Sequence, residues 1–344
     1  MADIVMADDG ISFDGASLER GPLGGAETAF LSLAVALAKR GHNVRVFNKC
    51  ETTMEKNGVK WTPLSDGIPD YCDLYIANRS DKLLTQAPDT RSTVFWIHNP
   101  AQYLLKYRYL SKIWRRKPSI VFSGEFHRDS YPGWAPDGGR EIIPYGISEE
   151  FRTVSPASNL PPPRAIFTSN PERGLSWLLD IWSDYVIPEL PEAELHVYSG
   201  TSTYGSHGEA RSQNMKPILE KAAELSNRNV KLCEPVSKEA LAQVFSESRV
   251  LLYRGDPGET FCLAVGEAQA AGVPAVVQDI GCVAERIVDG QTGFVTNSDE
   301  DFAKAAITLL ADDTLWRKHN QAALAIQRQW SWDDAAESFE RLVS

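Results

Sequence analysis

The chain of 344 residues is 43% hydrophobic and 24% charged, which is typical of a soluble globular protein with room for two domains. Its net charge of −11 argues against general nucleic-acid binding. Residues 1–150 are nearly balanced, with 18 basic and 19 acidic side chains, whereas the rest of the chain carries 17 basic and 27 acidic ones.

The sequence predicts a cytoplasmic protein. Its first ten residues, MADIVMADDG, lack the basic and apolar regions of a signal peptide. The apolar stretch Phe30–Ala38 is too short to span a bilayer. The five cysteines form neither a CxxC nor a His-paired metal motif, so we expect reduced thiols.

Short apolar strands alternate with helical patterns along the chain. In the first half, a helix over Gly25–Arg40 lies among strands predicted at 3–6, 43–47, 74–77, 94–98, 120–123 and 142–144. In the second half, strands at 164–168, 194–198, 230–233 and 250–253 alternate with helices at 175–186, 216–226 and 238–247. Helices predicted at 299–311, 314–329 and 332–342 close the chain. This alternation is typical of α/β proteins with doubly wound parallel sheets.

The pattern predicts two Rossmann-like domains joined by a linker. The segment Thr153–Pro163, TVSPASNLPPP, has four prolines and no periodicity, and we interpret it as the linker. We therefore expect one domain over 1–154 and a second over 164–328. Ligands should bind between them, at the C-terminal ends of the strands.

The segment Tyr253–Val277 carries the strongest functional signal. Its two carboxylates, Glu259 and Glu267, lie eight positions apart, and if both were helical their backbones would be about 12 Å apart. That exceeds the roughly 5–9.5 Å of glycosidase carboxylate pairs but suits two ends of a long ligand, such as a nucleotide diphosphate-sugar. Amides near Thr260–Leu263, at the helix start, are placed to bind its phosphates.

Two loops that precede helices are candidates for phosphate binding. The amides of Gly21–Gly25 could approach a phosphate, although a simple tight turn explains this loop equally well. The loop lacks the G-x-G-x-x-G dinucleotide spacing. In TSNPERGL, Arg173 beside Gly174 could pair with a diphosphate, and a capping turn with a solvated Arg173 is the alternative.

His98 ends the predicted strand VFWIH. A strand end faces the ligand site in this architecture, so a ligand-binding or acid/base role is open beside a purely structural one.

The segment Ala101–Lys117 carries six basic residues and no acidic one, interleaved with aromatic residues at helical spacing. Such a helix suits an anionic lipid surface or a phosphorylated acceptor, and a solvated helix with an aromatic core stripe is the alternative.

The sequence shows no D-x-D triplet, H-x-x-x-H motif or Cys/His cluster, which favours a metal-independent mechanism. It shows no G-x-S-x-G nucleophile elbow either.

Taken together, these segments resemble the retaining glycosyltransferases of the group 1, or family-four, type, which have the GT-B fold. The resemblance covers nearly the whole chain and is densest from Val250 to Gly293. It rests on five features: Glu259–Glu267 as the E-x7-E motif, Gly24-Gly25-Ala26-Glu27 as the N-terminal loop, Arg173-Gly174 as the basic residue before glycine, ERIVDGQTG at Glu285–Gly293, and the closing Trp330–Trp332 with the final helix.

The resemblance implies two Rossmann-like domains facing each other across a cleft, the first for the acceptor and the second for the donor. The final helix, 331–344, would cross back onto the first domain. Glu259 would contact the donor sugar hydroxyls and Glu267 the ribose. The remaining implied site residues are His98 beside the transferred sugar, Glu234 beside the nucleobase, and Gly24, Gly25, Arg173, Phe261, Cys262 and Leu263 along the diphosphate.

One departure from the family pattern concerns its second basic residue. The family often has G-R-x-x-x-x-K-G, whereas Ser169-Asn170 stands in that region here. Either Arg173 acts alone or Arg254 compensates.

The resemblance implies a metal-independent retaining enzyme that moves a hexose from a nucleotide diphosphate-sugar, with a UDP-sugar favoured, to a glycan or glycolipid acceptor. No metal or other cofactor is expected. Cell-surface polysaccharide or lipopolysaccharide synthesis is the expected setting, with peripheral attachment to the inner face of the membrane through 101–117. A sugar-nucleotide epimerase of the same fold and a non-catalytic sugar-nucleotide-binding protein are the alternatives.

Overall fold

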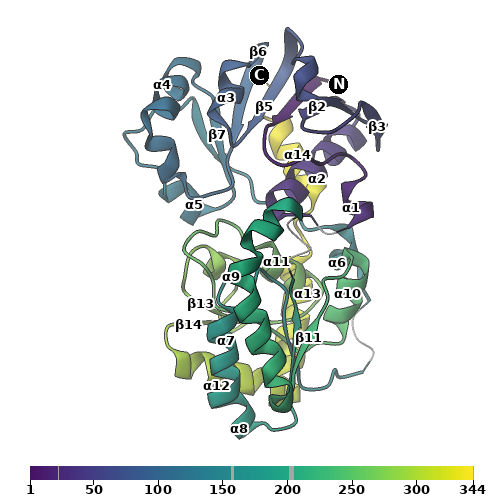
Figure 1. Ribbon diagram of the computed structural model, residues 1–344, viewed down its shortest axis with the longest axis vertical. Helices are drawn as coiled ribbons and strands as arrows, with labels where there is room; N and C mark the ends of the chain where they lie inside the picture. Colours follow the sequence, from purple (N-terminus) through teal and green to yellow (C-terminus); the bar gives the residue numbers. More distant parts are fainter. Residues whose placement is uncertain (22, 156–158, 201–204, 344) are drawn as a thin grey trace. The chain divides into compact units, whose positions relative to one another are not determined.

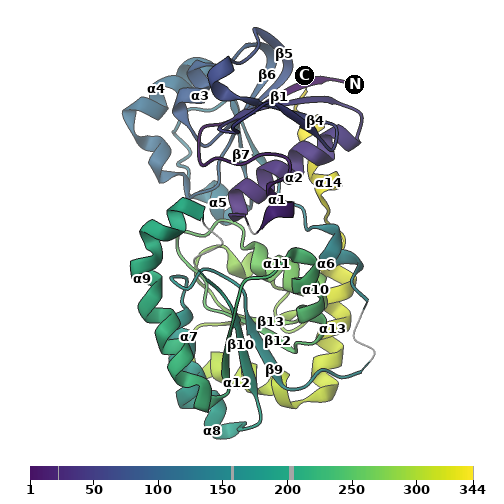
Figure 2. The same ribbon diagram turned by 45° about the vertical axis from the view of Figure 1, so that its right-hand side comes forward.

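The computed structural model describes residues 1–21, 23–155, 159–200 and 205–343. Pro22, in the glycine-rich loop, and residues 156–158, in the expected linker, therefore lie outside the described residues. Contacts divide the chain into two compact units. Unit 1 comprises Met1–Arg20, Gly24–Gly146 and Ser331–Ser344, and unit 2 comprises Gly21–Leu23 and Ile147–Trp330. In each unit, helices cover a central sheet (Figures 1 and 2).

In the described part of unit 1, the sheet has the order β3-β4-β2-β1-β5-β6-β7-β8, and only β3 runs antiparallel to its neighbour. Its strands are β1 (Asp3–Asp8), β2 (Asn43–Asn48), β3 (Met54–Lys56), β4 (Val59–Pro63), β5 (Tyr71–Asn78), β6 (Asp89–Trp96), β7 (Ser119–Phe122) and β8 (Gly139–Ile142). The predicted strand at 142–144 is therefore misplaced. Pro144 lacks the N–H that a sheet ladder needs, so the strand ends before it.

The hairpin of β3 and β4 was not predicted. Asn57 and Gly58 connect its strands with φ of 53° and 76°. A two-residue turn with both φ values positive favours Asn-Gly, so this dipeptide was the signal that could have revealed the hairpin.

The helices of unit 1 cover both faces of its sheet. They are α1 (Ser17–Arg20), α2 (Gly25–Lys39), α3 (Asp81–Thr85), α4 (Tyr107–Arg116), α5 (Glu125–Asp129) and α14 (Trp332–Glu340), with short 3-10 turns at Leu64–Asp66 and Ala101–Leu105. Right-handed crossovers that leave the sheet centre in opposite directions place α2 on one face and α3 and α4 on the other.

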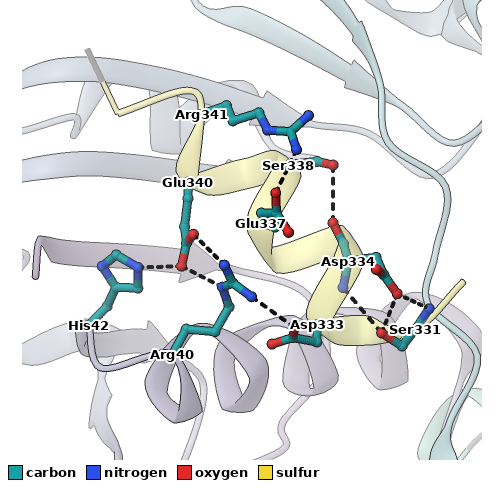
Figure 3. A network of polar contacts seen from close by, with 9 residues as sticks. All are labelled: Arg40, His42, Ser331, Asp333, Asp334, Glu337, Ser338, Glu340 and Arg341. Atoms are coloured by element: carbon teal, nitrogen blue, oxygen red, sulfur yellow. Dashed lines mark hydrogen bonds and ion pairs between the residues drawn. The ribbon is translucent and has the colours of Figure 1, made fainter.

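The final helix, α14, packs beside α2 in unit 1, as the resemblance implied (Figures 1 and 3). Arg40 holds it by donating to both carboxylate oxygens of Glu340, from Nε at 2.6 Å and from Nη2 at 2.9 Å. Arg40 also bonds Asp333 at 2.8 Å, and the His42 ring lies 2.7 Å from Glu340. Residues about 300 positions apart thus join the two ends of unit 1.

In the described part of unit 2, the sheet is parallel throughout, in the order β11-β10-β9-β12-β13-β14. Its strands are β9 (Arg164–Phe167), β10 (Glu194–Tyr198), β11 (Val230–Cys233), β12 (Val250–Tyr253), β13 (Ala275–Gln278) and β14 (Gly293–Thr296). Its helices are α6 (Glu149–Thr153), α7 (Leu175–Ile181), the π-helical turn η3 (Trp182–Val186), α8 (Ile187–Glu189), α9 (Gly205–Glu224), α10 (Lys238–Ser246), α11 (Leu263–Ala270), α12 (Asp299–Ala311) and α13 (Asp313–Gln327), with 3-10 turns at Leu225–Arg228 and Val283–Arg286.

Helix α9 begins at Gly205, eleven residues before the helix predicted at 216–226. Gly205 and Gly208 disfavour helix, and Pro217 lies inside it, so local propensity did not mark the first three turns. The other predicted strands and helices are confirmed within a few residues.

Both sheets are doubly wound, which confirms the predicted α/β class. Each has a point where the chain turns in opposite directions from two adjacent strands: between β1 and β5 in unit 1, and between β9 and β12 in unit 2. Loops at the C-terminal ends of such strands form the ligand-binding crevice of open α/β sheets.

Candidate functional site

The loops after β9 and β12 in unit 2 bring Arg173 and Glu259 together. Arg173 Nη1 donates to Glu259 Oε1 at 2.5 Å, and the Tyr253 hydroxyl donates to Oε2 at 2.7 Å. Both carboxylate oxygens are thus held, and Glu259 is only 6% exposed, whereas the Arg173 side chain is 38% exposed. Arg173 therefore presents a cation to solvent beside a buried carboxylate.

The conformation of the Arg173 loop depends on glycine. Gly174 has a φ of 84° and directly precedes α7. A Cβ at this position would lie 2.9 Å from the Cβ of Arg254, so a larger residue would push the two loops apart.

Burial controls the ionisation of this pair. Desolvation raises the pKa of Glu259 above its ordinary value, while Arg173 and Tyr253 oppose the shift. Burial also raises the pKa of Tyr253 far above its ordinary value, so this hydroxyl keeps its proton and remains a donor.

Helix α11 begins directly after this loop and has no side-chain cap. Cys262 precedes it in a left-handed conformation, with a φ of 62°. The first amide to bond back along the helix is that of Gly266, which donates to Cys262 O at 3.2 Å. The amides of Leu263–Val265 therefore stand before the first intrahelical bond; that of Val265 is directed at the Cys262 thiol, and those of Leu263 and Ala264 are placed for an anion. Since the helix begins at Leu263, Glu259 is not helical, and the 12 Å estimate does not apply.

The second carboxylate, Glu267, lies within α11 and has a different partner. Its Oε1 accepts from Lys238 Nζ at 2.9 Å, and Lys238 also donates to Ser148 Oγ at 2.9 Å. Glu234 is exposed in the loop after β11, at the edge of the sheet. The structure thus joins Glu259 to Arg173 but pairs Glu267 with a lysine that sequence reasoning did not identify.

In unit 1, His98 lies two residues beyond β6 and has both ring nitrogens bonded. Asn78 Nδ2 donates to Asp8 at 2.5 Å, so its Oδ1 is the acceptor for His98 Nε2–H at 2.6 Å. His98 Nδ1 then accepts from the Tyr145 hydroxyl. Burial lowers the pKa of His98 well below its ordinary value. His98 is therefore a neutral, fixed group, and acid/base chemistry at its ring would require one of these bonds to break.

A buried ion cluster surrounds this histidine and was not predicted. Arg79 Nη2 lies 2.9 Å from both Asp8 and Glu27, and Arg79 has a φ of 61°, which is strained for a residue with a side chain. Asp8 and Asn78 end the adjacent strands β1 and β5, so polar residues at strand ends were the signal for this cluster.

The predicted glycines lie beside this cluster. Gly24 precedes α2, and Gly25 is its first residue. A Cβ on Gly24 would lie 2.4 Å from Glu27 Oε2, so a larger residue here would displace the carboxylate of Glu27. Of the predicted site residues, Gly24, Gly25 and His98 thus belong to unit 1, and the others belong to unit 2.

Across the described parts of the chain, no three or more His, Cys, Asp or Glu side chains gather in a way that could hold a metal ion.

Solved structures share this architecture over nearly the whole chain. Sucrose-phosphate synthase from Thermosynechococcus elongatus matches with a TM-score of 0.75 at 17% identity, covering 99% of this chain and 98% of that one. Anabaena HepE, solved with UDP and glucose, matches with a TM-score of 0.71 at 14% identity and covers 99% of both chains. The class that the fold defines is that of the GT-B proteins.

Sequence comparisons find similarity to glycosyltransferases over part of the chain. Residues 162–312 match the model described as "Glycosyl transferases group 1". D-inositol 3-phosphate glycosyltransferase of Nocardia farcinica is 32% identical over 128 residues, which are 36% of this chain and 28% of that protein. Lipopolysaccharide 1,2-N-acetylglucosaminetransferase of Salmonella typhimurium is 21% identical over 82% of this chain and 78% of that protein. Although the first relatives are matched over less than a third of their length, the findings agree. Residues 162–312 are thus similar to the group 1 glycosyltransferases, and the chain has the GT-B fold.

Proposed function

We propose that this protein is a metal-independent, retaining glycosyltransferase that moves a hexose from a nucleotide diphosphate-sugar to a glycan or glycolipid acceptor. The observation that carries the proposal is the junction of Arg173, Glu259 and the uncapped start of α11 at the switch point of unit 2. At this junction the loops after β9 and β12 bring together the solvent-accessible cation of Arg173, the free amides at the start of α11 and the fixed carboxylate of Glu259.

The chemistry that fits this junction is electrostatic. When the bond between the sugar and the diphosphate breaks, negative charge grows on the leaving phosphate. Arg173 and the amides of Leu263 and Ala264 would stabilise that charge without a metal. Glu259, whose oxygens are fixed by Arg173 and Tyr253, would orient the sugar hydroxyls. The acceptor oxygen would then attack from the face that the diphosphate leaves, with retention of configuration.

Two solved structures of the same fold contain uridine nucleotides, which supports a uridine donor. Anabaena HepE was solved with UDP and glucose, and an Escherichia coli protein matching with a TM-score of 0.72 at 13% identity was solved with UDP-2-fluoro glucose. We extend this to a UDP-sugar for the present chain, with Glu267 binding the ribose hydroxyls and Glu234 beside the base. The lipopolysaccharide transferase among the relatives supports a role in cell-surface glycan synthesis.

A thermal-shift screen with UDP, GDP, ADP, TDP and NAD, with and without magnesium, tests the donor class. A ligand at 100 times its dissociation constant stabilises the folded state by about 2.7 kcal/mol. We expect one nucleoside diphosphate to stand out without magnesium and to lose its effect in Glu267→Ala. If no nucleoside diphosphate raises the melting temperature, or if NAD alone raises it, the proposal is contradicted.

The surface of α4 supports a site of peripheral attachment to an anionic membrane on the cytoplasmic side. Tyr107 and Trp114 on this helix are 85% and 70% exposed, and its last turn carries the exposed Arg115 and Arg116. Exposed aromatic rings beside cations suit the interface of an anionic bilayer. Among the described residues, no helix has the length and apolar character needed to cross a bilayer.

Liposome flotation tests this surface. We expect binding to vesicles containing phosphatidylserine and loss of that binding when Arg115, Arg116 and Lys117 are changed to Glu. Binding should also weaken for Trp114→Ser, which keeps the charge, and pure phosphatidylcholine vesicles serve as the control. Equal flotation of the wild type and the triple Glu variant would rule out attachment through α4.

A further inference from the structure

Arg286 forms no salt bridge with another described residue, and the carboxylate that interacts with it electrostatically is that of its exposed neighbour Glu285. The guanidinium carbon of Arg286 lies 4.4 Å from the centre of the Phe261 ring. Its Nε is buried without a hydrogen bond, and no ion pair joins its guanidinium to another described residue. Burying a charge is costly unless a partner compensates for the lost water, so an arginine placed in this way is suited to bind an anion.

The position of Arg286 coincides with the candidate donor site. Phe261, over which it lies, is two residues from Glu259 and two residues before α11. Arg173 contacts Glu259 and Arg286 lies over Phe261, and the two arginines approach this segment from different loops of unit 2. Two arginines therefore flank the segment between Glu259 and the free amides of α11, while Glu259 pairs with only one of them.

Although its Nε is buried, the Arg286 side chain is partly accessible to solvent. The residue is partly exposed, and it ends the 3-10 turn Val283–Arg286, which is fastened at its backbone because Gln327 Nε2 donates to Arg286 O at 3.2 Å. The hydrogen bond from Gln327 thus fixes the backbone of Arg286, and the N–H groups of its guanidinium are available as hydrogen-bond donors. Burial lowers the pKa of Arg286, but an arginine remains charged at physiological pH.

The loop after β9 lacks one of the basic residues that such a site could use. Ser169-Asn170 occupies the region, and the hydroxyl of the adjacent Thr168 is buried without a hydrogen bond. Arg254, the substitute considered from the sequence, has its own partners: its guanidinium carbon lies 5.1 Å from the centre of the Trp177 ring, and its Nε donates to Gln278 at 3.2 Å. Arg286 is the better candidate because its guanidinium donates no hydrogen bond to another described side chain.

We propose that Arg286 is the second cationic ligand of the donor's diphosphate, acting from the Phe261 side while Arg173 acts from the Glu259 side. This inference rests on the proposed function, because it assigns a residue to the diphosphate of a nucleotide-sugar. The two arginines would share the charge of the leaving group, as charge-assisted hydrogen bonds to phosphate oxygens allow.

Calorimetric titration of wild type, Arg286→Met and Arg286→Lys with UDP and with uridine tests the assignment. We expect Arg286→Met to weaken UDP binding about 10- to 100-fold, the typical value of a charged hydrogen bond, and to leave uridine binding unchanged. Arg286→Lys should retain most of the affinity for UDP because it keeps the charge. Methionine packs well against an aromatic ring, so the Met variant should fold, which its melting temperature will show.

Arg254→Met is the matched control, because Arg254 also lies over an aromatic ring of unit 2. We expect it to weaken UDP binding less than Arg286→Met does. Unchanged UDP affinity in Arg286→Met would overturn the inference and leave the proposed function intact. Equal losses for UDP and uridine would also overturn it, since Arg286 would then only position Phe261. If wild type binds none of UDP, GDP and ADP, the proposed function fails and the inference fails with it.

Discussion

Glu259 has its charge set by two neighbours. Burial raises the pKa of its carboxyl, whereas the cation of Arg173 and the hydroxyl of Tyr253 favour the ionised form. Such a balance is common where a residue serves a reaction rather than stability. In this protein, it makes the carboxylate dependent on the same arginine that we assign to the diphosphate.

Replacing Glu259 by Gln should therefore reduce activity more than stability. We expect kcat/KM for sugar transfer to fall at least about 100-fold, as for other groups that stabilise a transition state, while the melting temperature changes by only a few degrees. Arg173 remains solvated when its partner is neutral, which limits the cost to folding. Tyr253→Phe, which removes one bond to the same carboxylate, should cost about tenfold. A Glu259→Gln enzyme with full activity and a low melting temperature would show a purely structural carboxylate.

Histidine burial makes the stability of unit 1 sensitive to acid. His127 is fully buried, its Nε2 donates to Asn99 O at 2.9 Å, and burial lowers its pKa to about 4. In the unfolded chain His127 binds a proton near pH 6.5, whereas in the folded chain it binds one only near pH 4. The contribution of His127 is therefore complete above pH 6.5, and it is lost progressively as the pH falls toward 4.

From pH 7 to pH 5, His127 alone should cost about 2 kcal/mol of unfolding free energy. Denaturant unfolding at both pH values measures this loss, and His127→Gln should reduce the difference between them. His98, whose pKa is also lowered by burial, adds to the effect in the same direction. Equal pH dependence in the wild type and the His127 variant would mean that His127 can be protonated in the folded state.

At the scale of elements, unit 1 depends on a helix from the far end of the chain. Helix α14 begins with a reciprocal cap in which Ser331 Oγ accepts from the Asp334 amide, and Asp334 accepts from the Ser331 amide at 2.7 Å. Its Phe339 packs against Trp96, with ring centres 5.2 Å apart. Local capping starts the helix, and the aromatic contact and Arg40 hold it in place.

Removing the Arg40–Glu340 pair should weaken this attachment measurably. Both side chains are only about a quarter exposed, and Arg40 is bidentate, so Glu340→Gln should destabilise the protein by about 1–2 kcal/mol in denaturant unfolding. Arg341→Gln is the control on the same helix. Its ion pair to Glu337 is solvent-exposed, and its loss should cost less than about 0.5 kcal/mol (Figure 3). Similar losses for both variants would mean that the Arg40 pair contributes no more than a surface pair.

At the scale of the whole molecule, Arg173, Glu259, Glu267 and Arg286 all lie within unit 2. Hydrogen exchange with saturating UDP should therefore slow most in the segments around Arg173 and in 259–267. The strands of unit 1 should exchange at the same rate with and without UDP. Protection that is strongest in unit 1 would place the nucleotide at the Arg79 and His98 cluster instead.

The sequence by itself determined the class of fold and the order of elements, because both depend on local properties. Buried parallel strands appear as short apolar runs, and helices appear through their periodicity and stop signals. The E-x7-E motif and its helix start were visible because all their parts lie within nine residues. The β3–β4 hairpin was missed although Asn57-Gly58 marked its turn, and the start of α9 was missed because Gly205 and Gly208 disfavour a helix.

Only the tertiary structure decided which charges meet. Arg173 and Glu259 are 86 positions apart, and they pair because the sheet order places β9 beside β12. Lys238 beside Glu267, Arg79 between Asp8 and Glu27, and Arg286 over Phe261 have no counterpart in the linear pattern. The sequence shows the same residue type whether a charged side chain lies on a solvated surface or in a buried ion pair. The partners and the burial of that side chain follow from long-range packing, which residue spacing does not encode.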